Sequence, residues 1–359
     1  RDRARQVADY AVSVAERIED AEDRVWVLSG AADVLVRAGD RDRARQVAEN
    51  AVSLDEWIED PRQRARALPG VVDALAGAGL VDEALAVAER IEDPRQCARA
   101  LLGVAGAQVR AGLVGEALAV ADRAEGAKDR VRVLLRVVDE LVRVGDRDRA
   151  RQVAENAVSL DEWIEDPRQR ARALLGVAGA LVRVGDRDRA RQVAEKVVSV
   201  AELVDVLGSR VRLLSDVVDM LVRADETDKV WQVAENVVRV AERIEDPRER
   251  ARVLPGVVDA LAGAGLAVEA LAVAERIDSP EEQARALSWV VDVLVRAGDR
   301  DRARQVADYA VSVAERIEDA EDRVWVLSGA ADVLVRAGDR DRARQVAENA
   351  VSLDEWIED

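Results

Sequence analysis

The apolar residues of this chain recur around a repeated turn. Eleven residues before the turn the residue is always leucine, seven before it alanine or valine, and four before it leucine in every copy except Gln108. Five residues after the turn comes alanine, except at Val230, and eight and nine after it Val-Ala is invariant. Steps of three and four place these residues on one face of a helix on either side of the turn. Each copy is therefore predicted to be a hairpin of two α-helices. The turn residues are Gly39, Gly79, Gly112, Gly145, Gly185, Asp225, Gly265, Gly298 and Gly338.

The hairpins come in two lengths. Successive turn residues are 33 or 40 positions apart, and the seven extra residues are nearly two turns of α-helix. Such an insertion lengthens the second helix of a hairpin without rotating its apolar face. Where a new hairpin begins, Asp or Ser can cap the helix and proline fits its first turn. These starts are Asp60-Pro61, Asp93-Pro94, Asp166-Pro167, Asp246-Pro247 and Ser279-Pro280.

The spacing within a hairpin resembles the tetratricopeptide repeat. That family places a large residue, a small one, a second large one, a turn and then alanine at offsets matched here by Leu174, Ala178, Leu181, Gly185 and Ala190. Leucine replaces the aromatic residues of the family, and Ala194 stands where phenylalanine is usual. The resemblance implies an all-α solenoid, a superhelix of stacked antiparallel hairpins. Because most spacings exceed the short form, a HEAT-like solenoid with repeats of about 40 to 47 residues is the alternative.

The repeats cover the whole chain, which predicts one continuous array over residues 1–359. It would hold about nine hairpins and an orphan N-terminal helix, because residue 1 falls inside a repeat. Residues 1–60 are identical to residues 300–359, which indicates tandem duplication. Neither end has a polar capping helix, so we expect apolar faces to be exposed at both ends.

The charge of the chain narrows the classes of partner. Its 54 Lys and Arg stand against 72 Asp and Glu, a net charge of −18 that repels phosphate backbones and anionic lipid. A protein or peptide is therefore expected as the partner, and neither nucleic acid nor membrane. Richness in Ala, Arg, Gly, Val and Asp indicates a GC-rich, bacterial source. No signal peptide or membrane-spanning run is recognisable, so we expect a cytoplasmic location.

The residues that catalysis commonly uses are scarce. The chain has no His and a single cysteine, Cys97, which stands where Arg170 stands in another copy. No glycine-rich phosphate loop is present, and the carboxylates follow the regular repeat. We therefore expect no enzyme activity, no cofactor and no metal site in this chain.

Three charged columns are expected to line a concave surface made by the first helices, as the resemblance implies. An arginine lies thirteen residues before most turns, an aspartate six before and an arginine two before. Two interpretations remain open: a ladder of Asp–Arg pairs four residues apart, or a ligand site at the charges that lack such a partner. Arg110 and Arg183 lack the aspartate, whereas Asp73 and Asp259 lack the arginine. The Lys/Asn clamp by which the family holds a peptide carboxylate is absent. The candidate protein-binding residues are Trp26, Asp73, Arg99, Arg110, Arg132, Arg172, Arg183, Arg212, Asp259 and Trp325.

Three tryptophans, Trp57, Trp163 and Trp356, share one place near the end of long second helices. We expect them to pack against the next hairpin; if exposed, they would be contact anchors. The function that the sequence favours is a non-catalytic scaffold that binds a peptide or protein, as a repeat region of a larger bacterial protein. The alternative is a structural solenoid that stacks end to end.

Overall fold

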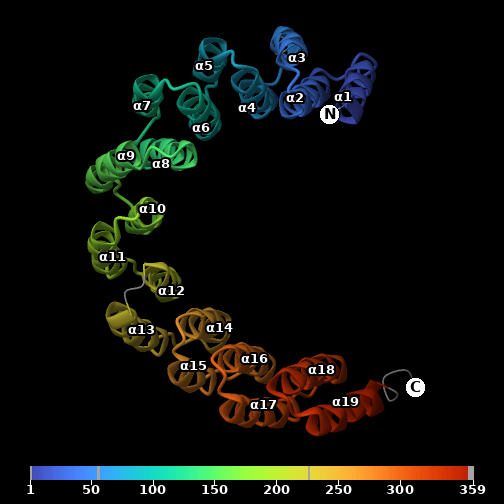
Figure 1. Ribbon diagram of the computed structural model, residues 1–359, viewed down its shortest axis with the longest axis vertical. Helices are drawn as coiled ribbons and strands as arrows, with labels where there is room; N and C mark the ends of the chain where they lie inside the picture. The colour runs from blue at the N-terminus through green and yellow to red at the C-terminus, as the bar shows by residue number, and fades with distance from the viewer. Residues whose placement is uncertain (1, 55–56, 225–226, 355–359) are drawn as a thin grey trace. The chain divides into compact units, whose positions relative to one another are not determined.

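The structure is a computed structural model that describes residues 2–54, 57–224 and 227–354. These residues form nineteen α-helices joined by short turns, and no strand occurs among them (Figure 1). The chain divides into two compact units, Arg1–Asp186 and Arg187–Asp359. The expected turn residue Asp225 lies outside the described residues.

The first unit consists of an initial helix followed by successive hairpins. Its helices are α1 (Asp2–Ala15), α2 (Ala21–Ala38), α3 (Arg41–Leu54), α4 (Pro61–Ala78), α5 (Val81–Glu89), α6 (Pro94–Arg110), α7 (Val114–Asp122), α8 (Ala127–Val144), α9 (Arg147–Ser159) and α10 (Pro167–Val184), with the 3-10 helix η2 (Asp161–Trp163) between the last two. The first helices of the hairpins, α2, α4, α6 and α8, each contact the first helix of the next hairpin. They therefore form one layer, and the second helices form the other.

The second unit repeats this arrangement. Its helices are α11 (Arg187–Ala201), α12 (Leu207–Arg223), α13 (Thr227–Ala241), α14 (Pro247–Gly263), α15 (Ala267–Ala274), α16 (Pro280–Arg296), α17 (Arg300–Ala314), α18 (Ala320–Ala337) and α19 (Arg340–Asp354). Here α12, α14, α16 and α18 are the first helices, and each contacts the next.

The helices end at the predicted turn glycines and begin at the predicted capping residues. Gly39 closes α2 in the left-handed conformation, with φ +83°, and its N–H points at the carbonyls of Leu35 and Val36. A residue with a Cβ would be strained there. At the other end of a hairpin, the Asp93 side chain accepts a hydrogen bond from the N–H of Gln96 at 2.8 Å, which caps α6.

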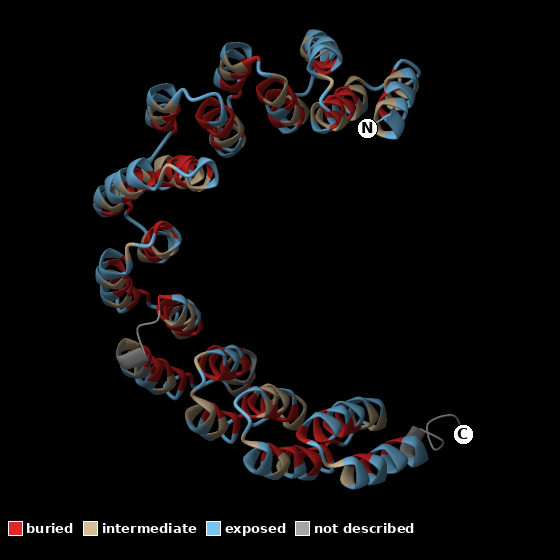
Figure 2. Ribbon diagram, in the orientation of Figure 1, coloured by how far each residue is buried: buried red, intermediate tan, exposed pale blue. Residues whose placement is uncertain are grey.

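The core consists of the predicted leucine, alanine and valine columns. The leucine eleven residues before the turn is buried in all nine copies, and Figure 2 shows buried residues on the helix faces that meet. The Val-Ala pair after the turn is also buried, except that Ala347 of α19 is exposed because no hairpin follows it in the structure. The prediction of an all-α solenoid of helix hairpins is confirmed.

Candidate protein-binding groove

The first unit has an open groove of about 1110 Å³ on one face. It is lined by side chains of α1, α2, α4, α6 and α8, so it follows the layer of first helices. Its volume lies slightly above the ~300–1,000 Å³ typical of ligand pockets. We call this surface the first-helix groove.

Glycines form the floor of the first-helix groove. Gly30, Gly70 and Gly103 each lie nine residues before a turn and line the groove from successive first helices. At Gly103 an added Cβ would lie 2.1 Å from Oδ1 of Asp73, so the Asp73 side chain would have to move to make room for it. At Gly30, by contrast, an added Cβ would meet nothing within 4 Å.

This glycine column is not among the residues predicted for the site, although its signal in the sequence is regular. Six of the nine copies have glycine nine residues before the turn, on the same helix face as the charged columns. The exceptions are Arg136, Asp216 and Trp289. Arg136 therefore projects a long cation where most first helices have no side chain.

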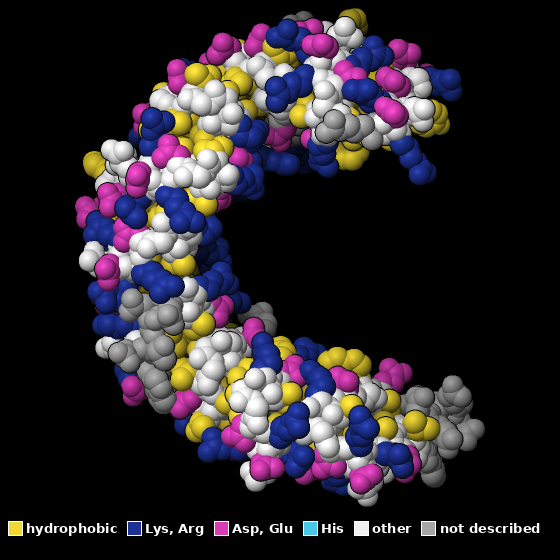
Figure 3. All heavy atoms as spheres, in the orientation of Figure 1, with side chains coloured by type: hydrophobic (Ala, Val, Ile, Leu, Met, Phe, Trp, Pro, Cys, Tyr) yellow, Lys and Arg dark blue, Asp and Glu magenta, His cyan; other side chains and the backbone are white. Residues whose placement is uncertain are grey.

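Three arginines of the groove converge on one buried carboxylate. Oε1 of Glu140 lies 2.9 Å from a guanidinium nitrogen of Arg136, 3.0 Å from one of Arg143 and 3.1 Å from one of Arg110. The Glu140 side chain is only 1% exposed, whereas Arg110 and Arg143 are well exposed. One carboxylate cannot balance three cations, and each guanidinium carries five N–H donors. This arginine cluster therefore has a net positive charge and presents further N–H donors to the groove. Figure 3 shows dark blue Lys and Arg side chains gathered where α6 and α8 lie in Figure 1.

Two aspartates also line the groove. Asp33 forms an ion pair with Arg37 one turn further along α2. Asp73 has no ion pair within hydrogen-bonding distance among the described residues. Partial burial raises the pKa of Asp73, and this effect outweighs the nearby positive charge of Arg99, which lowers it.

One end of the groove is mainly apolar, apart from the Asp33–Arg37 pair of α2. Trp26 of α2 lines it and is 74% exposed, and Val27 and Val34 of the same helix lie beside it. A ligand of the groove would therefore meet apolar side chains near α2 and arginines near α6 and α8.

The groove brings together three of the ten candidate residues, namely Trp26, Asp73 and Arg110. Four more are exposed on first helices of the first unit without lining the groove: Arg99, Arg132, Arg172 and Arg183. The other three, Arg212, Asp259 and Trp325, are exposed on first helices of the second unit.

The expectation that Arg110 and Arg183 are unpaired is wrong. Arg110 reaches Glu140 of the next first helix, and Arg183 reaches Asp139 of the preceding one at 2.7 Å. Both pairs join neighbouring hairpins, which a search four residues along one helix does not detect. The ladder interpretation is therefore partly right: Arg37 pairs with Asp33 on its own helix, and other pairs cross between hairpins.

The tryptophans at the ends of long second helices do not pack as expected. Trp163 is 77% exposed and Trp57 is similarly exposed, whereas the isoleucine that follows each of them is buried. The isoleucine takes the packing position, so the indole is left outside. Trp356 and the side chain of Trp231 lie outside the described residues.

The single cysteine of the chain, Cys97, is half-buried. Burial raises the pKa of the Cys97 thiol, which keeps it protonated and poorly nucleophilic. Among the described residues no group of three potential metal ligands occurs, and no helix there has the length and apolar character needed to cross a membrane.

The hairpins, their turns and their layered packing agree with a match in two segments of the chain. Residues 30–96 and 136–202 match the family described as tetratricopeptide repeat. The chain carries tetratricopeptide-like repeats in these segments. Proteins of such repeats are in general non-catalytic scaffolds that bind on the surface formed by stacked helices.

Solved structures with helical repeats resemble parts or all of the chain. A signal transduction ATPase with a tetratricopeptide repeat sensor, from Pyrococcus horikoshii, is 12% identical with a TM-score of 0.36; the match covers 99% of this chain and 53% of that one. A Rap protein complexed with competence and sporulation factor is 12% identical with a TM-score of 0.33, covering 94% and 99%. The apo form of RapI is 13% identical with a TM-score of 0.37, covering 93% and 98%. No curated protein matches the chain. Likenesses this distant carry over no ligand.

Proposed function

We propose that this tetratricopeptide-like protein is a non-catalytic scaffold that holds a peptide or protein segment in the first-helix groove. The observation that carries the proposal is the groove itself, which has a glycine floor, an apolar end and a cationic end. An extended segment can approach the helix backbone at Gly30, where an added Cβ would meet nothing within 4 Å. That the chain is a repeat region of a larger bacterial protein stays a prediction.

Charge favours a protein segment over nucleic acid as the occupant. Four arginines and two aspartates line the groove, yet the chain as a whole has a net charge of −18. A long polyanion would gain at the arginine cluster and be repelled by the remaining surface. A short segment that reaches only the groove would meet the local positive charge.

Filling the groove tests this proposal, because the duplication supplies a matched control. Gly30→Leu places a side chain in the groove, and Gly329→Leu makes the same change in the identical stretch of α18. An added Cβ has space at both positions. Fluorescein-labelled decapeptides of acidic, basic, apolar and neutral polar composition would be titrated into each variant and followed by anisotropy.

We expect at least one class of decapeptide to bind, Gly30→Leu to weaken its binding at least tenfold, and Gly329→Leu to leave it unchanged. Binding by no class, or binding that ignores Gly30→Leu, would overturn the proposal.

A second candidate function is end-to-end self-association, favoured by the apolar face of α1. Tyr10 of α1 is exposed, whereas its duplicate Tyr309 is partly covered by α16 and lies 3.4 Å from Nε2 of Gln283. The face of α1 could therefore accept a helix of a second copy. Tyr10→Arg should then reduce any concentration-dependent increase in mass measured by light scattering, and an unchanged increase would rule this face out.

A further inference from the structure

The segment between α9 and α10 holds an exposed tryptophan on a rigid support. The N–H of Trp163 bonds to the carbonyl of Leu160 at 3.2 Å, and the N–H of Ile164 bonds to that of Asp161 at 3.0 Å. The Asp161 side chain is buried and lies 2.9 Å from both Nε and Nη2 of Arg170. We call residues Leu160–Asp166 the tryptophan turn.

A single position explains why this indole is exposed. In the short second helices, the residue at this place is an arginine that can pair with the preceding hairpin: Arg123 pairs with Glu89, and Arg276 pairs with Glu242. Trp163 has no charge with which to make such a pair, so its side chain extends into solvent. The buried Ile164 and the Asp161–Arg170 pair hold the turn in place without using the indole.

The charge of the tryptophan turn is negative around the indole. Glu162 and Glu165 flank Trp163 closely, and both are exposed. The charge of Asp161 is offset by Arg170, and Asp166 caps α10 by accepting a hydrogen bond from the N–H of Gln169 at 2.7 Å. The two glutamates therefore remain to meet a cationic surface. An anionic rim also disfavours insertion of this tryptophan into an anionic membrane surface.

The first-helix groove has the complementary character. Its apolar end, with Trp26 and Val34, can accept an aromatic side chain. The cluster of Arg110, Arg136 and Arg143 on Glu140 can donate hydrogen bonds to carboxylates. The tryptophan turn of the same chain does not occupy this groove, since Trp163 is 77% exposed and does not line it.

We propose that the first-helix groove takes the tryptophan turn of a second copy of this chain, with the indole at the apolar end and the glutamates on the arginine cluster. This inference rests on the proposed function and names the occupant of the groove. The contact is heterologous, because groove and turn are different surfaces, so one groove of each pair of copies stays free for a further copy. A single turn buries less area than a standard interface, so the association is weak and depends on concentration.

A peptide isolates this contact from the rest of the chain. The probe is fluorescein-labelled Leu-Asp-Glu-Trp-Ile-Glu-Asp amide, which is the sequence of residues 160–166. It is titrated into the full chain alongside one peptide with Trp replaced by Ala and another with all carboxylates replaced by amides. We expect each control peptide to bind at least tenfold more weakly. Gly30→Leu and the pair Arg110→Gln with Arg143→Gln should weaken the parent peptide similarly, and Gly329→Leu should not.

Sedimentation velocity of complementary variants tests the contact between chains. The same sequence recurs at residues 54–60 and 353–359, so the turn variant combines Trp57→Arg, Trp163→Arg and Trp356→Arg. Arginine is the residue found at this place in other hairpins, so the fold should tolerate it. The turn variant alone and Gly30→Leu alone should remain monomeric, and an equimolar mixture should regain a heterodimer, because one chain has an intact groove and the other has intact turns.

Two results would overturn the proposal. One is a mixture that stays monomeric at concentrations where the unchanged chain associates. The other is failure of the residue 160–166 peptide to bind. If that peptide fails while another decapeptide class binds in a manner sensitive to Gly30→Leu, the groove keeps its proposed function and only the occupant is wrong. If no class binds, both proposals fail.

Discussion

Residues 2–54 and 301–353 have the same sequence but different neighbours in the structure. Val7 of α1 is 57% exposed, whereas its duplicate Val306 of α17 is 5% exposed because α16 packs against α17. At the other end of the duplicated segment, the first copy is the buried one and the second copy is exposed. Ala48 of α3 is buried beneath α4, whereas Ala347 of α19 is exposed.

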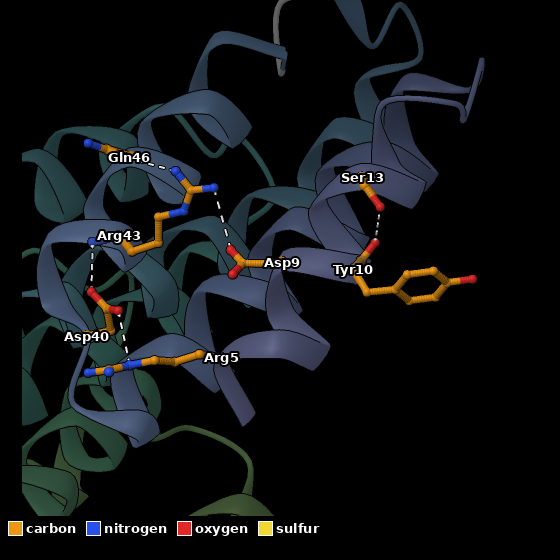
Figure 4. Close-up of polar contacts among 7 residues, drawn as sticks. All are labelled: Arg5, Asp9, Tyr10, Ser13, Asp40, Arg43 and Gln46. Carbon is orange, nitrogen blue, oxygen red and sulfur yellow. Dashed lines mark hydrogen bonds and ion pairs between the residues drawn. The ribbon is translucent and has the colours of Figure 1, made fainter. Parts of the chain in front are cut away.

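What stays constant between the copies is the contact between their second helices. Arg43 lies 3.5 Å from Asp9, and the duplicate pair Arg342–Asp308 recurs at 3.0 Å. Figure 4 shows the Arg43–Asp9 pair, with Tyr10 pointing away from it. The sequence of a hairpin therefore specifies its internal contacts and gives it two apolar outer faces. Which of those faces is buried depends on whether a neighbouring hairpin packs against it.

The largest expected effect on stability comes from placing a carboxylate at the same position in both copies. Val306→Asp would bury an unpaired charge against α16 and should lower the free energy of unfolding by about 3 kcal/mol or more. Val7→Asp should change it by less than ~0.5 kcal/mol, because the side chain is exposed. Urea unfolding followed by circular dichroism measures both. Equal losses would mean that α1 is covered in solution.

A second pair of variants examines the opposite face. Ala48→Leu would overpack the contact between α3 and α4 and should destabilise the chain by about 1–3 kcal/mol. Ala347→Leu should be close to neutral. The same urea titration applies, and a large loss at Ala347 would contradict the view that neighbours determine the cost.

A third change compares one hairpin with the other eight. Gln108 replaces the core leucine four residues before the turn, and its Oε1 is buried without a hydrogen-bond partner. Gln108→Leu should stabilise the chain by about 1–2 kcal/mol, because it removes an unsatisfied acceptor. Thermal unfolding measures the gain. A loss of stability would show that the site is shaped for the amide.

The smallest expected effect concerns Asp73. Partial burial raises its pKa in the folded chain, so the folded state favours the protonated acid. The stabilisation from this shift is present below the pKa of the unfolded chain and is lost as pH rises through the folded pKa. Asp73→Asn should therefore raise the melting temperature slightly at pH 7, and the difference should disappear as the pH falls below 4. A difference that grows on acidification would give the shift the opposite sign.

The sequence was sufficient for the fold because its signals are local and repeated. Leu28, Ala32 and Leu35 follow helix spacing, and Gly39 ends the helix, so the hairpin and its core could be predicted from one copy. The prediction that residues 1–359 form one continuous array stays a prediction.

The site was less predictable, because its contacts cross between hairpins. Arg110 and Glu140 are thirty residues apart, and their meeting depends on how closely α6 and α8 approach. Trp163 was placed wrongly because Ile164, one residue later, occupies the packing position.

The two lengths of second helix have a consequence for how such a chain can evolve. Whether the second helix has nine residues, as in α5, or fourteen, as in α3, the next hairpin begins with the same apolar face directed at its neighbour. Unequal recombination between copies can therefore add, remove or exchange hairpins without disrupting the packing contacts with the hairpins on either side. The identical residues 1–60 and 300–359 are what a gene built from interchangeable copies would leave behind, and the variable positions, such as Arg136 and Trp163, are where such a gene can alter the surface of a hairpin and keep its core.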